Sequence, residues 1–291
     1  MIEPRSGLPP WLRRPLATSG QFNAVNGLLE DLAVHTVCQS AKCPNRGECF
    51  ASGTATFLIM GDACTRGCRF CAVDTRVPEP LDADEPRRVA EAAAALGLSH
   101  VVITTVTRDD VADGGAAHFV AVVDAVRAAV PDADIEVLTS DFGGRLESVD
   151  AVATSRPDVY NHNLETVPRL YAEVRPGADY QRSLDVLARA HSTQPDLPTK
   201  SGLMLGLGET PDEVLEVMDD LLGHGVSILT LGQYLRPSQE HLPVVEYVEP
   251  SVFAELARTA YRKGFSAVAS SPYVRSSYHA GELAQEAASD G

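Results

Sequence analysis

Short apolar runs alternate with longer amphipathic segments along the chain from Thr56 onward. The segments between the runs carry apolar residues three and four positions apart, which is the spacing of a helix with one buried face. The runs predict strands at 56–61, 100–106, 135–140, 159–164, 200–205 and 227–235, and the segments predict helices at 85–97, 116–130, 180–191 and 211–225. This alternation of strands and helices indicates a parallel sheet or barrel.

Capping residues mark one of these helices, and the regions before and after the alternation lack its regular pattern. The helix predicted at 211–225 has Thr210 as its N-cap and Pro211 as its first residue. After 235 the pattern predicts a helix at 250–264, one more strand at 265–272 and a polar tail. Before Thr56 it predicts a helix at about 22–32, followed by a cysteine-containing loop for which we expect no regular helix or strand.

Polar residues gather directly after the predicted strands. Five such segments occur, at 104–115, 140–144, 161–166, 206–210 and 233–238. In parallel β/α barrels the chemistry takes place at the carboxyl ends of the strands. Solvated loops are the alternative for any single segment, but the recurrence of the same relative position favours a functional rim.

Composition and charge narrow the class of protein. The chain has 291 residues, of which 44% are hydrophobic and 22% charged, and a formal net charge of −16. This acidity argues against broad electrostatic binding of nucleic acid or an anionic membrane surface. No apolar run approaches the roughly 20 residues that cross a bilayer, and we expect neither a secretory signal nor a membrane segment. The expected compartment is the cytoplasm, where cysteines stay reduced.

All six cysteines of the chain lie between residues 38 and 71. Cysteines that merely fill a core would be scattered, and disulfides do not suit the expected compartment. A structural zinc site prefers four Cys or His ligands, so two triplets fit it poorly, although His35 could complete the first one. Iron–sulfur clusters accept short cysteine spacings and are the favoured interpretation.

The second triplet, Cys64-x3-Cys68-x2-Cys71, supplies only three ligands. A 4Fe–4S cluster takes one ligand at each of four iron atoms, so three thiolates leave one iron open. An open metal position is typical of a catalytic site, because a substrate or cofactor can bind there.

This triplet, on a loop just after the first barrel strand, resembles that of the radical S-adenosylmethionine superfamily. Phe70 and the segment 202–209 match as well, and in the latter the resemblance implies S-adenosylmethionine contacts from Gly202, Met204, Gly206 and Glu209. The resemblance also implies that the open iron binds S-adenosylmethionine, which is cleaved to a 5′-deoxyadenosyl radical. The usual Gly-Gly-Glu after the second strand is absent, and 113–115 could stand in for it.

The first triplet, Cys38-x4-Cys43-x5-Cys49, together with the Arg-Ser-Ser-Tyr motif at 275–278, resembles the lipoyl synthase family. The likeness covers nearly the whole chain. It implies that the first triplet holds an auxiliary 4Fe–4S cluster, which supplies sulfur and takes a serine as its fourth ligand. We carry that ligand to Ser277, with Ser276 as the alternative. The implied reaction is insertion of two sulfur atoms at carbons 6 and 8 of a protein-bound octanoyl-lysine.

The expected fold is therefore a partial (β/α)6 TIM-like barrel. The expected regions are an extension with the auxiliary ligands at 1–54, the barrel at 55–240, and a C-terminal segment at 241–291 that folds back. Alternate residues of a strand share a face, so Asn161, Asn163 and Glu165 are expected to point into the barrel as candidate S-adenosylmethionine contacts, against the alternative of a rim network. His162 would point outward, and Arg236 could meet a carboxylate or form a surface ion pair.

The family resemblance also implies the partners. These are octanoylated lipoyl-carrier proteins, namely the lipoyl domains of 2-oxoacid dehydrogenase acyltransferases and the glycine-cleavage H protein, and a flavodoxin or ferredoxin type of electron donor. Two alternatives remain at this point. One is another radical enzyme with an auxiliary cluster, such as a biotin-synthase-like sulfur inserter or a methylthiotransferase. The other is a non-enzymatic zinc or iron–sulfur protein.

Overall fold

One twisted sheet, curved into an incomplete barrel, forms the centre of the molecule. A computed structural model describes residues 7–13, 20–51, 55–278 and 280–289. Seven parallel strands follow in sequence order within these ranges: β2 (Thr56–Ile59), β3 (His100–Thr105), β4 (Asp134–Leu138), β5 (Val159–Asn161), β6 (Thr199–Leu205), β7 (Ile228–Gln233) and β8 (Ala267–Ser270). The short β1 (His35–Thr36) pairs antiparallel with β2, so β1 and β8 form the two edges.

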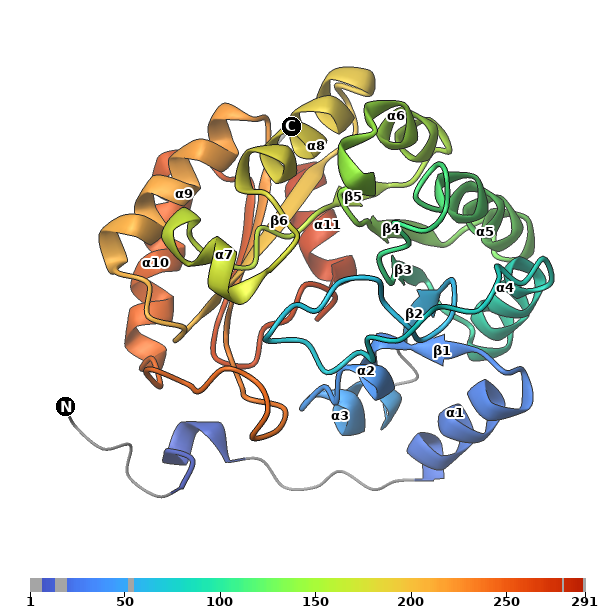
Figure 1. Cartoon of the computed structure of the whole chain (residues 1–291), viewed down its shortest axis with the longest axis horizontal. Helices are drawn as coiled ribbons and strands as arrows, with labels where there is room; N and C mark the ends of the chain where they lie inside the picture. Colours follow the sequence, from blue (N-terminus) through green and yellow to red (C-terminus); the bar gives the residue numbers. More distant parts are fainter. Residues whose placement is uncertain (1–6, 14–19, 52–54, 279, 290–291) are drawn as a thin grey trace.

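Helices cover the outside of this sheet, and Figure 1 shows them as a ring around the strands. They are α4 (Glu85–Leu96), α5 (Ala116–Ala129), α6 (Leu146–Thr154), α8 (Tyr180–Thr193), α9 (Pro211–Gly223) and α10 (Pro250–Lys263). Each lies between two successive strands, which gives six strand–helix repeats and one closing strand. The predicted partial barrel is confirmed. The sequence pattern did not predict α6.

Local chemistry explains where these helices begin and which face they bury. The hydroxyl of Thr210 caps α9 by accepting from the amide of Glu213. The carboxylate of Glu213 in turn accepts from the amide of Thr210, which completes a capping box. The face of α9 that packs on the sheet carries Val214, Met218 and Leu221, at the spacing of an amphipathic helix. By contrast, all four residues of β2 are buried, as expected for a strand covered on both faces.

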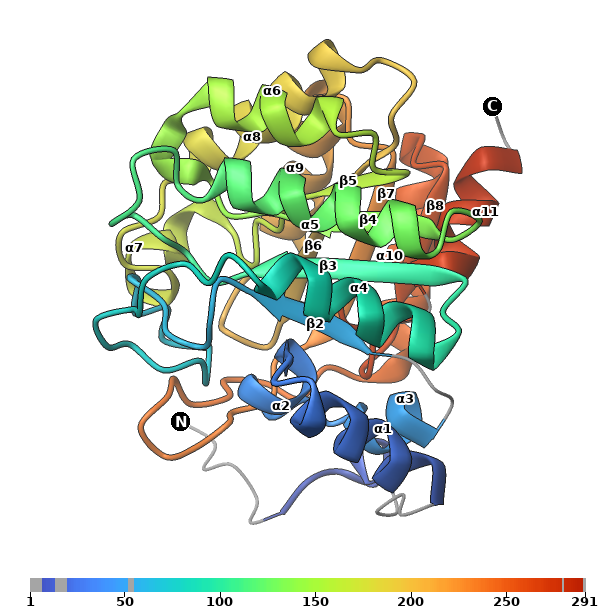
Figure 2. The ribbon, with the colours of Figure 1, turned by 90° about the vertical axis from the view of Figure 1, so that its right-hand side faces the viewer.

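Two expectations about the ends of the chain were wrong. The cysteine-containing loop has two short helices, α2 (Val37–Ser40) and α3 (Arg46–Ala51), which follow α1 (Gly20–Asp31) below β2 (Figure 2). The hydroxyl of Thr36 caps α2, and such side-chain caps stabilise helical turns too short for periodicity to reveal. The polar tail also contains a helix, α11 (Ala280–Ser289), whose alanine-rich sequence shows little apolar pattern.

The C-terminal helix closes one end of the barrel. Leu283 of α11 packs with Val159, Ile228 and Ala267, which are the first residues of β5, β7 and β8. The carboxyl ends of the strands, where the cysteine loop begins, therefore lie at the opposite end from α11. Shorter elements are η1 (Pro10–Leu12), η2 (Phe142–Gly144), η3 (Pro168–Leu170) and α7 (Tyr171–Val174). In the described part of the chain, no helix is long and apolar enough to cross a membrane.

Candidate active site

The loop with Cys64, Cys68 and Cys71 starts just after β2 and is held by backbone hydrogen bonds. The amide of Cys64 donates to the carbonyl of Asp74 at 2.8 Å, which closes the loop near its base. Further along, the amide of Arg69 donates to the carbonyl of Val174 at 2.9 Å. The loop is thus fixed both to itself and to α7.

An arginine inside the cysteine loop anchors it to the rim of the barrel. The guanidinium of Arg66 donates to both carboxylate oxygens of Asp109 at 2.8 Å and to Asp141 at 2.8 Å. The carboxylate of Asp141 also forms an ion pair with the guanidinium of Arg182, with a nitrogen–oxygen distance of 3.3 Å. The side chain of Asp141 is only 1% exposed. Burial raises the pKa of Asp141, but Arg66 outweighs this effect and holds that pKa well below its usual range. The cysteine loop is therefore attached by charge as well as by backbone.

The three thiols of this loop fit an iron–sulfur cluster in their chemistry and surroundings. Burial, with smaller contributions from Cys68 and Cys64, raises the pKa of Cys71 to about 12. The pKa of Cys68 is also raised by burial, against the opposing charge of Arg175. Thiols that interact in this way gain most from a cationic iron centre, because it stabilises all three thiolates together. Among the described residues, no three His, Cys, Asp or Glu side chains are close enough to hold a single metal ion.

The predicted contact residues after β5 form one hydrogen-bonded group. The strand ends at Asn161, earlier than predicted, so Asn163 and Glu165 lie beyond it. The amide nitrogen of Asn163 donates to Glu165 at 3.0 Å, and Asn161 donates to Glu136 at 2.8 Å. Glu165 has a φ of 67°, which ends the alternation of an extended strand. Burial raises the pKa of Glu165.

Segment 202–209 passes from β6 into a loop beside this group. A Cβ atom on Gly202 would lie 2.4 Å from the hydroxyl of Thr230, so only glycine fits there. At Gly206, φ is 100° and a Cβ would lie 2.3 Å from the Gln233 side chain. Neighbouring atoms of the protein occupy the space beside both glycines, so packing within the fold requires glycine here.

The remaining predicted residues of this segment help to form the same loop. The carboxylate of Glu209 accepts from the amides of Gly206 and Leu207. Burial raises the pKa of Glu209 against these bonds. The amide of Met204 donates to the carbonyl of Glu165 at 2.9 Å, and Phe70 packs on the apolar core that includes β6. These positions bring the cysteine loop and the adenine-contacting segment implied by the resemblance to one end of the barrel.

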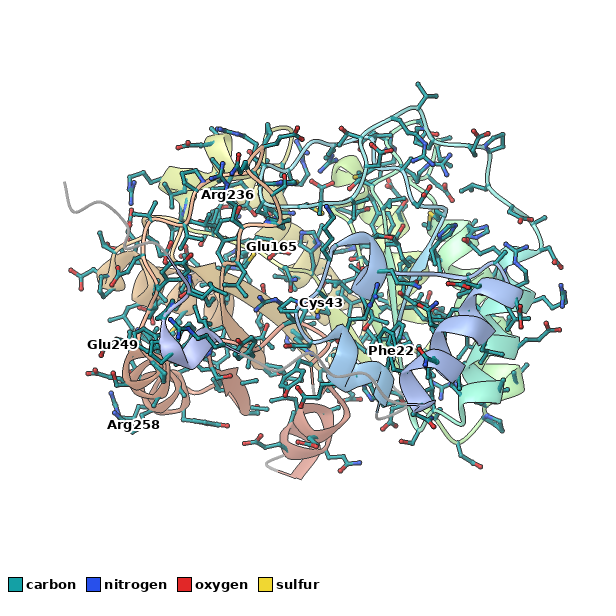
Figure 3. The ribbon with its side chains drawn as sticks, turned by 90° about the horizontal axis from the view of Figure 1, so that it is seen from below. Phe22, Cys43, Glu165, Arg236, Glu249 and Arg258 are labelled. Carbon is teal, nitrogen blue, oxygen red and sulfur yellow. The ribbon has the colours of Figure 1, made fainter. Side chains whose placement is uncertain are left out.

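The first cysteine triplet lies on the short helices α2 and α3 and the turn between them, below the barrel in Figure 2. Figure 3 labels Cys43 there, and Phe22 on the neighbouring α1. Burial, followed by the charge of Cys43, raises the pKa of Cys38 to about 11. Burial likewise raises the pKa of Cys49 to about 12, with Cys38 as the next cause. The three thiols therefore interact with one another as a second group that also fits an iron–sulfur cluster.

Two contacts tie this triplet to the Arg-Ser-Ser-Tyr segment. The buried side chain of Asn45 donates to the carbonyl of Tyr273 at 2.7 Å. The hydroxyl of Tyr278 donates to Glu48, next to Cys49, at 3.0 Å. These bonds join residues more than two hundred positions apart, so the structure brings the first triplet and the C-terminal motif together.

The two serines of the motif have different surroundings. The hydroxyl of Ser276 donates to Asn163 at 2.6 Å and accepts from Asn161 at 3.4 Å. Within the part of the chain that the structure describes, Ser277 has no side-chain hydrogen bond. The structure thus places Ser276 inside the barrel with the asparagines and leaves the Ser277 hydroxyl without a competing partner.

Several residues at the site were not singled out from the sequence. Arg175, which is partly buried, donates to the carbonyls of Asn163 and Leu164 and carries charge beside Cys68. The sequence gives no signal for it, because Arg175 is one of several charged residues between 169 and 182. Arg236, a candidate carboxylate partner, instead donates to the backbone carbonyls of Gln239 and His241.

Two further candidates have local structural roles. Asp113, in the segment considered as a replacement for Gly-Gly-Glu, accepts from the amides of Gly115 and Ala117 at the start of α5. His162 is buried, and its ring is 2.8 Å from the carbonyl of Thr139.

The solved structures most similar in shape support the fold alone. Methylornithine synthase superposes with a TM-score of 0.56 and 15% identity, covering 87% of this chain and 75% of that protein. Coproporphyrinogen III oxidase from Escherichia coli gives a TM-score of 0.53 and 13% identity, over 74% of this chain and 55% of that one.

Sequence comparisons identify the family. The model of the Radical SAM superfamily matches residues 58–221. The lipoyl synthase of Methylococcus capsulatus is 55% identical over 97% of this chain and 89% of that protein. The lipoyl synthase of Thiobacillus denitrificans is 54% identical over 98% of this chain and 92% of its own length. On this similarity over nearly its whole length, the chain belongs to the lipoyl synthase family of the radical SAM superfamily.

Proposed function

We propose that this chain forms the lipoyl cofactor with two 4Fe–4S clusters held by its two cysteine triplets. The reaction is insertion of sulfur at carbons 6 and 8 of an octanoyl chain on a lysine of a carrier protein. Superfamily membership implies one 4Fe–4S cluster and S-adenosylmethionine, which supply the 5′-deoxyadenosyl radical when bound. Cys64, Cys68 and Cys71 are the proposed ligands of that cluster.

The proposed auxiliary cluster is held by Cys38, Cys43, Cys49 and Ser277. The observation that carries this assignment is the attachment of the first triplet to the Arg-Ser-Ser-Tyr segment, through Asn45 on one side and Tyr278 on the other. These contacts support the assignment, because they join the region of the three thiols to the chain on both sides of Ser277. Ser277 is favoured over its neighbour because Ser276 is engaged by the two asparagines.

The barrel residues would orient S-adenosylmethionine and the substrate. Asn163 and Glu165 present polar groups at the end of the barrel where the cysteine loop lies. Gly202 and Gly206 pack closely against Thr230 and Gln233, which would hold in place the backbone of the segment that the resemblance assigns to adenine contacts. Met204, Phe70 and Glu209 complete the proposed cofactor surroundings. A closed barrel interior would also exclude water and stray hydrogen donors from a carbon radical.

The proposed regions are the auxiliary extension at 1–54, the barrel at 55–240 and the C-terminal segment at 241–291. Lipoyl synthases act on lipoyl-carrier proteins, and radical enzymes need a reductant. The specific partners we propose are lipoyl domains of 2-oxoacid dehydrogenases, the glycine-cleavage H protein, and a flavodoxin or ferredoxin. We place the protein in the cytoplasm, because six free cysteines and oxygen-sensitive clusters suit a reducing compartment.

Anaerobic turnover with an octanoylated peptide tests this function. The purified, reconstituted protein is incubated with the peptide, S-adenosylmethionine and reductant, and the products are measured by mass spectrometry. We expect about eight iron atoms per chain, the sum of two cubanes, and a peptide that gains two sulfur atoms. A peptide with unmodified lysine is the control. Formation of 5′-deoxyadenosine without any thiolated peptide would contradict the proposed reaction.

A further inference from the structure

A buried ion pair lies inside the barrel below the asparagines. The ammonium of Lys200, on β6, is 3.0 and 2.9 Å from the two carboxylate oxygens of Glu136, on β4. Both residues have no solvent exposure. His100 lies on the same side, with a ring nitrogen 3.8 Å from Glu136. This pair is separate from the cysteines, and the reaction as proposed above does not use it.

The ion pair determines the direction of a hydrogen-bond chain. Burial raises the pKa of Glu136, but Lys200 lowers it below its usual value, so the carboxylate is ionised and can only accept. The side chain of Asn161 must therefore turn its NH2 group toward Glu136, at 2.8 Å. The second hydrogen of that group faces Ser276 at 3.4 Å.

The same order of donors and acceptors continues from Ser276 to Asn163 and Glu165. A serine hydroxyl has one proton, and Ser276 donates it to the side-chain amide oxygen of Asn163 at 2.6 Å. Asn163 must then turn its own NH2 group toward Glu165, at 3.0 Å. The donors and acceptors of these bonds are consistent with the charge at the start of the chain, while the side-chain oxygen of Asn161 is buried without a partner among the described residues.

We propose that Glu136 and Lys200 are positioning residues that orient Asn161 and thereby hold the Ser276–Ser277 segment in place for the auxiliary cluster. This inference rests on the proposed function, in which Ser277 is a cluster ligand. A neutral group in place of Glu136 could donate as well as accept, and it would leave the orientation of Asn161 undetermined. The serine segment would then lose a fixed partner one residue from the ligand.

The S-adenosylmethionine side depends less on this chain. The amide of Glu165 donates to the carbonyl of Gly202 at 2.9 Å, and the amide of Met204 donates to the carbonyl of Glu165 at 2.9 Å. These are backbone bonds, which do not depend on the orientation of Asn161. A change at the ion pair should therefore disturb the auxiliary cluster more than the cleavage of S-adenosylmethionine.

Two variants test the proposal. Lys200→Met leaves a buried carboxylate without its partner and is expected to lower stability. The double variant Glu136→Gln with Lys200→Met removes both charges, so it is expected to keep near wild-type thermal stability. His118→Gln is the matched control, because His118 forms another buried pair, with Glu85 at 2.6 Å, outside the barrel.

The decisive measurement is the electron paramagnetic resonance spectrum of the reduced auxiliary cluster. It is recorded with Cys64, Cys68 and Cys71 all changed to alanine, so that only the auxiliary cluster remains. The double variant should give an altered spectrum, and with all cysteines present its sulfur insertion should fall by about tenfold. Its 5′-deoxyadenosine formation should stay within about threefold of wild type, and His118→Gln should keep the wild-type spectrum.

The outcomes separate this inference from the proposed function. A stable double variant with a wild-type spectrum and wild-type sulfur insertion would show that the pair only fills the barrel, and it would overturn the inference. A wild-type protein that makes no thiolated peptide would instead overturn the proposed function. If Lys200→Met does not fold, the double variant still tests whether the ion pair positions the serine segment.

Discussion

The two cysteine triplets are held by different parts of the fold. The loop with Cys64 leaves a buried parallel strand, and its anchors are an ion-pair group on the rim and backbone bonds to neighbouring loops. The triplet with Cys38 lies outside the parallel strands on two short helices. Its described links to the C-terminal motif are one buried amide and one tyrosine hydroxyl.

This difference has a physical consequence. A site on a barrel rim inherits the rigidity of the sheet, so it should survive the loss of any single hydrogen bond. A site assembled from both ends of a chain depends on a few long-range contacts, and local opening there costs less free energy. A cluster that supplies sulfur must also be taken apart, and the region that depends on the contacts between the chain ends is the one to which the resemblance assigns that role.

The largest expected effect comes from removing one ligand in each triplet. Cys64→Ala should abolish 5′-deoxyadenosine formation while the auxiliary cluster still assembles. Cys49→Ala should still cleave S-adenosylmethionine but add no sulfur to the octanoyl chain. Iron content, 5′-deoxyadenosine and thiolated peptide are measured on both. Undiminished cleavage by Cys64→Ala, or normal lipoyl product from Cys49→Ala, would contradict the assignment of separate functions to the two cysteine triplets.

Loss of the ion pair between Arg66 and Asp141 should have the second-largest effect. Arg66→Met leaves Asp141 buried with only the more distant Arg182, and breaking such a pair costs about 3 kcal/mol or more. We expect lower thermal stability and slower 5′-deoxyadenosine formation, with the auxiliary cluster retained. The control is Arg189→Met, which breaks a more exposed pair with Asp150 and should cost much less stability. Equal losses in the two variants would show that burial of the rim pair is unimportant.

The proposed serine ligand gives the third prediction. Ser277→Cys should keep a full complement of iron, because a thiolate binds iron more firmly than an alkoxide. The same firmness should slow sulfur insertion by making that iron harder to release. Ser276→Ala should be milder. Iron analysis and mono- and dithiolated product distinguish the two, and normal turnover by Ser277→Cys would show that lability is not the reason for a serine.

Contacts between the chain ends give a smaller effect. Asn45→Ala leaves the buried carbonyl of Tyr273 without this donor, which costs about 1–3 kcal/mol. Tyr278→Phe removes an exposed bond and should cost less. Both variants should lose auxiliary iron, Asn45→Ala more than Tyr278→Phe, while 5′-deoxyadenosine formation is unchanged. Loss of cleavage in parallel with auxiliary iron would show that the two sites are not independent.

The effect that is smallest at neutral pH is a pH dependence of stability, which arises from His162. Burial lowers the pKa of His162 from 6.5 to about 4. Between these values the unfolded chain binds more protons than the folded one, so the free energy of unfolding rises with pH across this interval and is flat above it. His162→Gln should remove about 2 kcal/mol of this rise between pH 5 and pH 7. Chemical denaturation at pH 5 and pH 7 measures it, and an unchanged pH difference would contradict the assignment.

The sequence by itself determined the barrel and the chemistry of its ligands. Strand and helix periodicity depends on neighbours a few residues away, so the repeats from β2 to α10 could be predicted apart from the short α6. Cysteine spacing is local too, which is why 64–71 and 38–49 were recognisable as two groups. The capping signal at Thr210 is of the same kind, and the structure contains it as predicted.

Only the tertiary structure decided how the distant parts meet. No local pattern predicts that Asn45 reaches Tyr273, that α11 covers the starts of the strands, or that Ser276 enters the barrel between two asparagines. The buried pair of Glu136 and Lys200 is equally invisible, because each residue alone reads as an ordinary charge in a strand. Such contacts depend on which side chains share a space after folding, and sequence separation carries no information about that.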